Sequence, residues 1–236
     1  MTTEMLRCEG CASGYDDTIV IRDISLTVEQ GMIFGVLGKN GMGKSTLLKT
    51  IMGFLKLEAG AIYIAGEKVN SMPPQVLARR GVSYVQQENA IFQDMTVAEN
   101  LRLSLPRDRY LKEGLERIAH YFPVIPQRLR QTAGTLSGGE QKMLLMSRAM
   151  ITKPKLVLID EISEGLQPTM VDRVGEALKR LREEEGATIF LVEQNVGFVA
   201  DVCDRIASIK IGSIVETRDI TPGAETRDAL LELMRI

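Results

Sequence analysis

The chain alternates short apolar runs with amphipathic segments. Residues 33–37, 156–159 and 189–192 are uninterrupted apolar runs of strand length, a pattern typical of strands buried on both faces of a parallel sheet. Residues 24–28 instead alternate strictly between apolar and polar, as a half-buried strand does. Residues 61–69 read as two strands joined by a tight turn. The pattern therefore predicts an α/β fold in which a mainly parallel core carries an antiparallel β subdomain.

Helical patterns occupy the segments between these strands. Residues 44–54 follow a glycine-rich turn and place apolar residues on one face, and the methionines of 140–151 are expected to fill a core rather than to bind a ligand. Pro168 opens a helix that Gly186 ends.

Residues 88–135 lack the pattern of buried strands, and Thr96 with Glu99 has the spacing of a capping box at a helix start. We expect a single domain over residues 1–236. Its core would comprise residues 1–87 and 155–236, with a helical subdomain inserted at about 88–154.

Charge and composition exclude several classes of protein. The 236 residues include 29 Lys and Arg and 31 Asp and Glu, a net charge of −2, which argues against nucleic-acid binding by bulk electrostatics and against a polybasic membrane anchor. We find neither an apolar run of about 18 residues nor a secretory signal, so we expect no transmembrane segment and a cytoplasmic chain.

The cysteines do not favour a metal or redox site. Cys8 and Cys11 form a C-x-x-C pair, but a zinc site needs two further ligands. Cys203 and the single histidine, His120, are far from that pair in sequence. We therefore expect no zinc site, and a locally bonded or solvated His120.

Residues 38–45 read GKNGMGKS and match the phosphate-binding pattern G-x-x-x-x-G-K-[ST] between a predicted strand and a predicted helix. Glycines let backbone N–H groups converge on phosphate oxygens, and the helix that follows points its positive end at the anion. Lys44 would reach the β- and γ-phosphates of ATP, and the Ser45 hydroxyl would bind Mg²⁺.

The apolar run 156–159 ends in Asp160 and Glu161. Ligands of open α/β sheets bind at the carboxyl ends of the strands, so two carboxylates at this position suit a phosphate site. Asp160 would hold Mg²⁺, and Glu161 would act as general base on the attacking water.

Residues 136–141 read LSGGEQ and open an apolar helix. Together with the 38–45 loop and Asp160-Glu161, this stretch resembles the signature of the ATP-binding-cassette ATPases, and the resemblance covers about residues 4–220. It implies a dimer in which the signature of one subunit, Ser137, Gly138 and Gly139, covers the nucleotide held by the other. Nucleotide binding is expected at Gly38, Asn40, Gly41, Gly43, Lys44, Ser45 and Thr46.

The same resemblance assigns three further positions. Tyr15 would stack on adenine, although a tyrosine in a surface loop is the alternative. Gln87 would sense Mg²⁺ and the γ-phosphate in the segment that faces a membrane subunit, the neighbouring Gln86 being less consistent with the spacing to Glu99. Gln194 would contact the γ-phosphate at the position where the family has a switch histidine.

Three positions depart from the family pattern. Ile162 replaces the usual proline after the catalytic glutamate, Gln167 replaces an aspartate, and Gln194 replaces the switch histidine. Glutamine can donate a hydrogen bond to a phosphate oxygen but cannot become cationic. These changes leave open a non-catalytic regulatory cassette, which the presence of Lys44 and Glu161 argues against.

The Glu193-Gln194 pair resembles the energy-coupling ATPases of bacterial importers for branched-chain amino acids, and of related importers for urea and short amides. Residues 163–168 lean towards the urea branch, and the short C-terminal tail resembles the smaller of the two ATPase subunits of such systems. The implied partners are transmembrane permeases, a second identical or different ATPase and, indirectly, an external substrate-binding protein. The chain would lie at the cytoplasmic face of the membrane. A soluble cassette acting on nucleic acid or ribosomes is a distant alternative.

Overall fold

The computed structural model describes residues 3–70, 72–87, 91–221 and 229–231, whose strands form two sheets. The first sheet is antiparallel and has the order β2-β1-β4-β5. Its strands are β1 (Glu4–Tyr15), β2 (Thr18–Glu29), β4 (Leu57–Ile64) and β5 (Glu67–Lys68). The second sheet has the order β10-β9-β3-β8-β7-β6. Its strands are β3 (Ile33–Leu37), β6 (Val82–Val85), β7 (Leu156–Asp160), β8 (Thr188–Glu193), β9 (Arg205–Lys210) and β10 (Ser213–Asp219).

The second sheet is parallel from β9 through β6 and carries β10 as an antiparallel edge. Every residue of β3, β7 and β8 is buried, which confirms the three apolar runs as strands covered on both faces. The predicted alternating strand lies within β2, and the predicted strand pair corresponds to the end of β4, a turn and β5.

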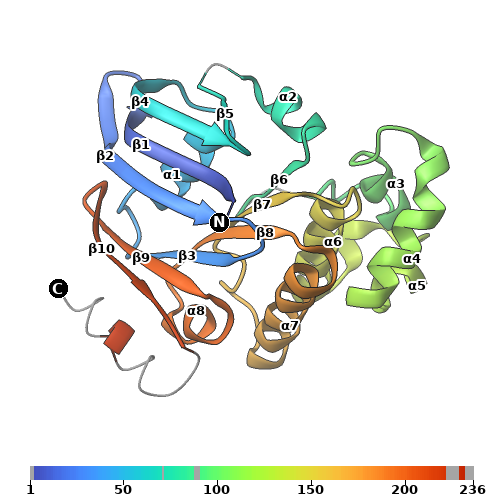
Figure 1. The fold of residues 1–236 in the computed structure, drawn as a ribbon. Helices are drawn as coiled ribbons and strands as arrows, with labels where there is room; N and C mark the ends of the chain where they lie inside the picture. The colour runs from blue at the N-terminus through green and yellow to red at the C-terminus, as the bar shows by residue number, and fades with distance from the viewer. Residues whose placement is uncertain (1–2, 71, 88–90, 222–228, 232–236) are drawn as a thin grey trace.

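The helices cover the sheets and the end of the molecule remote from β10 (Figure 1). They are α1 (Lys44–Ile51), α2 (Pro74–Arg79), α3 (Val97–Arg102), α4 (Leu111–Tyr121), α5 (Val124–Gln127), α6 (Gly138–Met150), α7 (Pro168–Glu185) and α8 (Val196–Val202). Short 3₁₀ turns cover Asp108–Tyr110 and Ala133–Thr135. Gly186 ends α7 in the left-handed region, at φ +66°, as predicted.

Helix α1 is shorter than its apolar pattern predicts, because the chain turns away after Ile51. Gly53 has φ +77°, and a Cβ there would lie 2.4 Å from the Met72 carbonyl oxygen. The Phe54 N–H donates to the Lys49 carbonyl oxygen over 2.8 Å, so Gly53 ends the helix as a left-handed glycine cap, and the approach of Met72 excludes a side chain there.

Two apolar cores flank the parallel sheet. One contains α1 between the two sheets, and the rings of Phe34 and Phe190 stack there with centroids 5.7 Å apart. The other packs α6, α7 and α8 against the opposite face and includes the methionines Met143, Met146 and Met150, which are buried as predicted. Helices α3 to α6 come between β6 and β7 in the chain, as an inserted helical part requires. The exact domain limits remain a prediction, and residues 1–2, 88–90, 222–228 and 232–236 lie outside the described residues.

The cysteines are core residues. Cys8, Cys11 and Cys203 are buried free thiols, and Cys11 Sγ donates a hydrogen bond to the Ala61 carbonyl oxygen over 3.3 Å. Burial raises the pKa of the Cys203 thiol. His120 lies on the surface beside Glu184, with 2.6 Å between His120 Nε2 and Glu184 Oε2.

The described residues contain no cluster of three or more His, Cys, Asp or Glu side chains that could hold a metal ion. None of the described helices is long and apolar enough to cross a bilayer.

The capping box at α3 gives the first prediction. Thr96 Oγ1 accepts the Glu99 N–H over 3.2 Å, and Glu99 Oε2 accepts the Thr96 N–H over 2.8 Å. Thr96→Ala removes the hydroxyl cap and is expected to lower the free energy of unfolding by about 1 kcal/mol, measured by urea denaturation. Thr96→Ser keeps the cap and serves as control. Equal stability of the alanine and serine variants would contradict this role.

Candidate nucleotide site

The loop between β3 and α1 leaves the carboxyl end of the parallel sheet. Gly41 and Gly43 have φ of +79° and +98°, a region that favours glycine. Gly38 also requires glycine, because a Cβ there would lie 2.7 Å from Ile209 Cγ2. The sequence pattern therefore corresponds to a tightly bent loop whose N–H groups precede the first turn of α1.

Neighbouring segments hold this loop at both ends. The Gly38 N–H donates to the Glu193 carbonyl oxygen over 3.2 Å, and the Gly212 N–H donates to the Met42 carbonyl oxygen over 3.1 Å. The carbonyl of Gly212 in turn accepts the Arg22 N–H over 2.7 Å. The turn between β9 and β10 thus connects the loop to β2 in the antiparallel sheet.

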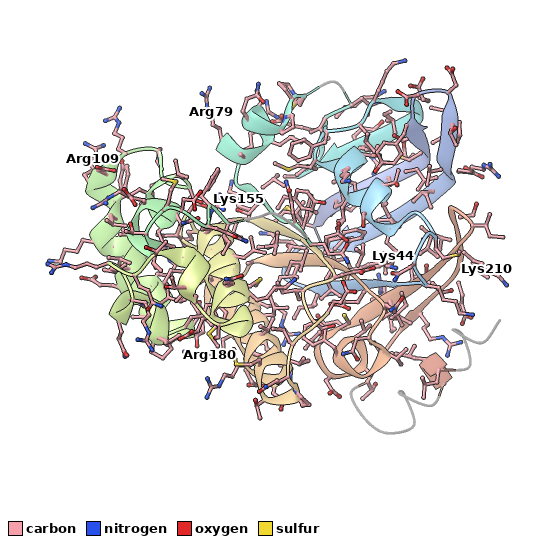
Figure 2. The ribbon with its side chains drawn as sticks, turned by 180° about the vertical axis from the view of Figure 1, so that it is seen from behind. Lys44, Arg79, Arg109, Lys155, Arg180 and Lys210 are labelled. Carbon is pink, nitrogen blue, oxygen red and sulfur yellow. The ribbon has the colours of Figure 1, made fainter. Side chains whose placement is uncertain are left out.

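Lys44 is buried at the start of α1, and Figure 2 shows it inside the molecule, while the labelled Arg79, Arg109 and Arg180 project outward. Its Nζ donates to the carbonyl oxygens of Gly38 at 2.7 Å and Lys39 at 2.9 Å, and it lies 2.9 Å from Glu161 Oε1. A buried ammonium requires such partners, because desolvation of an unpaired charge costs several kcal/mol (about 3–5 when a partner is removed).

Asp160 ends β7 beside the first turn of α1. Ser45 Oγ donates to Asp160 Oδ1 over 2.9 Å, and the Tyr84 hydroxyl donates to Oδ2 over 3.2 Å. Burial raises the pKa of Asp160, and the two hydrogen bonds oppose that rise. Burial beside Asp160 also raises the pKa of Tyr84. Carboxylate and hydroxyl oxygens are ligands that suit Mg²⁺, so the donor set fits that ion.

Glu161 is buried and adopts φ +44°, which is rare for a residue with a side chain. Its N–H donates to the Val192 carbonyl oxygen over 3.0 Å, which holds this conformation. Its Oε1 faces Lys44, and its Oε2 accepts Gln87 Nε2 over 2.8 Å. The Gln87 amide also donates to Glu164 Oε2 over 2.5 Å, whereas Gln86 lines a different cavity.

The remaining predicted residues lie at the rim. Tyr15 is 42% exposed at the end of β1, and Lys49 Nζ lies 3.4 Å from its hydroxyl and 5.7 Å from its ring centre. Gln194 is exposed after β8, and its backbone N–H donates to Glu193. Thr46 is buried within α1 and Asn40 is exposed in the loop.

The LSGGE residues start α6 and contact their own helix rather than the 38–45 loop. Ser137 Oγ accepts the Glu140 N–H over 3.3 Å and donates to Glu140 Oε2 over 2.9 Å, so Ser137 caps α6. The Ser137 backbone N–H also donates to Glu140 Oε2 over 3.0 Å, and this hydrogen bond together with that of the hydroxyl lowers the pKa of Glu140. Gly138 lines a cleft of about 310 Å³ together with Gln87 and Glu164.

Sequence reasoning assigned no role to four groups that touch the site. Tyr84 holds Asp160, Glu164 holds Gln87, Lys49 faces Tyr15, and Glu193 accepts the N–H and hydroxyl of Ser163. The one available signal was for Glu193, a carboxylate at the end of an apolar run like that of Asp160.

Comparison with known proteins places the chain in a family. The family described as ABC transporter matches residues 21–164. The high-affinity branched-chain amino acid transport ATP-binding protein BraG of Pseudomonas aeruginosa is 36% identical over 214 residues, covering 89% of this chain and 91% of BraG. The lipopolysaccharide export system ATP-binding protein LptB of Haemophilus influenzae is 33% identical over 221 residues, with 90% of each chain covered.

Solved structures agree on the fold. A nucleotide-free ATP-binding cassette from an ABC transporter superposes with a TM-score of 0.86 at 24% identity, covering 97% of this chain and 95% of that one. The chain therefore belongs to the ABC transporter family, with the α/β cassette fold predicted from its sequence. It is an ATP-binding subunit of the kind that hydrolyses ATP.

The raised pKa of Asp160 yields a stability prediction. A carboxyl whose pKa is higher in the folded than in the unfolded chain favours folding when protonated, so stability falls as pH rises through these values. Asp160→Asn is therefore expected to unfold at a higher urea concentration than the parent at pH 7, with a difference that narrows as the pH is lowered.

Asp172→Asn, on the exposed face of α7, is the matched control and should change the free energy of unfolding little, both at pH 7 and at lower pH. A less stable Asp160→Asn at neutral pH would show that the charge of Asp160 is favoured in the folded chain.

Proposed function

We propose that this chain is the ATP-hydrolysing, energy-coupling subunit of an importer for branched-chain or other hydrophobic amino acids. The observation that carries the proposal is the 36% identity to BraG, which extends over 89% of this chain and 91% of that protein. The Glu193-Gln194 pair, which suggested this kind of importer from the sequence, ends β8 beside the nucleotide site.

In this proposal the loop from Gly38 to Thr46 holds the phosphates of ATP. A phosphate oxygen at Lys44 Nζ would take the place of Glu161 as partner of the ammonium, which lies 2.9 Å from Glu161 Oε1. Glu161 would then be free to accept a proton from the attacking water as general base. Binding of ATP would thereby free Glu161 to act as the general base.

Three oxygen donors would hold Mg²⁺: the Ser45 hydroxyl, the Asp160 carboxylate and the Gln87 side-chain carbonyl. The ion supplies neutralisation of the charge on the phosphate oxygens. Gln194 would donate a hydrogen bond to the γ-phosphate, and Tyr15 would stack on adenine. Tyr15 is 42% exposed, which leaves its ring accessible to a base.

The subunit would work as a dimer. Ser137, Gly138 and Gly139 open α6 and contact groups other than the 38–45 loop of their own chain, which favours a role toward the nucleotide of a second cassette. A solved cassette with a TM-score of 0.78 at 22% identity is dimeric in a post-hydrolysis state bound to ADP and Pi. We propose the same kind of pairing here, with an identical or a different ATPase.

The other proposed partners are transmembrane permeases and, through them, an external substrate-binding protein. The chain would lie peripherally on the cytoplasmic face of the membrane and would not bind nucleic acid. The second candidate cargo is urea or a short amide, which the stretch 163–168 favours. LptB, at 33% identity, acts in lipopolysaccharide export, so export is the third outcome that an experiment must distinguish.

The catalytic part of the proposal predicts the effect of Glu161→Gln. The amide cannot accept a proton, so steady-state ATP hydrolysis by the chain with its co-purified partners is expected to fall by about 100-fold or more. Glu176→Gln, on the exposed side of α7, is the control and should hydrolyse ATP like the parent. Unchanged turnover in Glu161→Gln would assign the chemistry to the partner's site or identify a regulatory cassette.

The cargo is tested by purification and transport. The tagged chain would be extracted from its native membranes in mild detergent, and its partners identified by mass spectrometry. Reconstituted vesicles that accumulate leucine with ATP, but not urea or acetamide, would support the amino-acid importer. Uptake of urea or acetamide would move the assignment to the second candidate. Co-purification with lipopolysaccharide-export components, or with soluble proteins or ribosomes alone, would overturn both.

A further inference from the structure

Glu193 is a buried carboxylate for which the proposed chemistry has no use. It ends β8 with 1% of its surface exposed, directly before the switch residue Gln194. A carboxylate is rarely buried this deeply without a compensating set of hydrogen bonds. Its contacts therefore indicate what it does.

The carboxylate accepts hydrogen bonds from two separate loops. From the segment after β7, the Ser163 N–H donates to Glu193 Oε1 and the Ser163 hydroxyl to Oε2, each over 2.9 Å. From the segment after β8, the N–H groups of Gln194 and Asn195 donate to Oε2 over 3.2 and 3.4 Å. Burial raises the pKa of Glu193, and these hydrogen bonds oppose the rise.

The backbone at Glu193 reaches a third loop. Its carbonyl oxygen accepts the Gly38 N–H at the start of the phosphate loop. One residue earlier, the Val192 carbonyl accepts the Glu161 N–H and holds that residue at φ +44°. The end of β8 is thus bonded to the segments that carry Lys44, Glu161 and Gln194.

We propose that Glu193 is a positioning residue for ATP hydrolysis. Through Ser163 it fixes the segment that carries the general base, and through the N–H groups after β8 it fixes the switch glutamine. Glu193 itself touches neither the nucleotide nor the water. The inference rests on the proposed site at Glu161 and Gln194 but not on the cargo of the transporter.

Glutamine at position 193 tests this role because it has the same shape but offers one acceptor oxygen where the carboxylate offers two. If its amide nitrogen took the position of Oε1, it would face the Ser163 N–H, donor against donor. If it took the position of Oε2, it would face the N–H groups of Gln194 and Asn195. The first orientation removes the acceptor of the Ser163 N–H, and the second removes the acceptor of the Gln194 and Asn195 N–H groups, so each weakens the hold on one loop while the volume of the core is kept.

The experiment measures kcat, KM for ATP and thermal stability for the full chain with its co-purified partners. Glu193→Gln is expected to lower kcat by about 10- to 100-fold, because displacing a catalytic group by about 1 Å can cost about 100-fold in rate. KM should stay within about threefold, since the phosphate loop keeps its backbone bond to residue 193.

Ser163→Ala removes the hydroxyl donor alone and tests the same path in a variant that changes the core less. It should lower kcat by about 3- to 10-fold, in line with the loss of one hydrogen bond. The double variant should be no slower than Glu193→Gln, because both changes act on one connection.

Thr188→Val is the matched control at the opposite end of β8. Thr188 is fully buried and its hydroxyl accepts the Gly31 N–H over 2.9 Å, so this isostere also costs a buried hydrogen bond. It should lower the melting temperature and leave kcat unchanged. A kcat for Glu193→Gln equal to that of the parent would overturn the proposal.

Two further results would also overturn it: a loss of kcat in Thr188→Val as large as in Glu193→Gln, or additive losses from Ser163→Ala and Glu193→Gln. Full activity of Ser163→Ala overturns it even where Glu193→Gln does not fold. If Glu161 were not the general base, Glu161→Gln would hydrolyse ATP in this assay at the rate of the parent. That result distinguishes a failure of the proposed function from a failure of the inference about Glu193.

Discussion

The charges of Lys44 and Glu161 are both buried and lie 2.9 Å apart, so each compensates part of the desolvation cost of the other. The pair spans the gap between the loop after β3 and the end of β7, so the two segments cannot be positioned independently. The two loop carbonyls that accept from Lys44, together with Gln87, complete the set of partners that the buried charges require. In the proposed mechanism a phosphate oxygen would replace the Glu161 carboxylate as partner of the Lys44 ammonium.

The parallel sheet makes such a concentration of charge possible. Strands β3, β7 and β8 are buried on both faces and end at one edge, so each contributes its first polar residues to the same small volume. The carboxylates of Asp160 and Glu193 lie there and accept hydrogen bonds from hydroxyl and N–H donors. These hydrogen bonds offset part of the cost of burying the two groups.

The sequence predicts the strands of this site well because their signal is local. The apolar runs that became β3, β7 and β8, the glycines of the phosphate loop and the Pro168 and Gly186 that bound α7 are each determined within a few residues. The partners of the carboxylates are not local. Tyr84 and Asp160, or Ser163 and Glu193, meet only because β6, β7 and β8 are neighbours in the sheet. The approach of the Met72 carbonyl to Gly53, which excludes a side chain there, is likewise not local.

The turn between β9 and β10 joins the antiparallel sheet to the 38–45 loop. Gly212 has φ +78°, donates to the phosphate loop at Met42 and accepts from Arg22 of the antiparallel sheet, and a Cβ there would lie 1.9 Å from the Val20 carbonyl oxygen. Neither a longer turn nor another residue fits this position without separating the sheet that carries Tyr15 from the loop that carries Lys44. This one turn therefore holds the sheet that carries Tyr15 in a fixed position relative to the loop that carries Lys44.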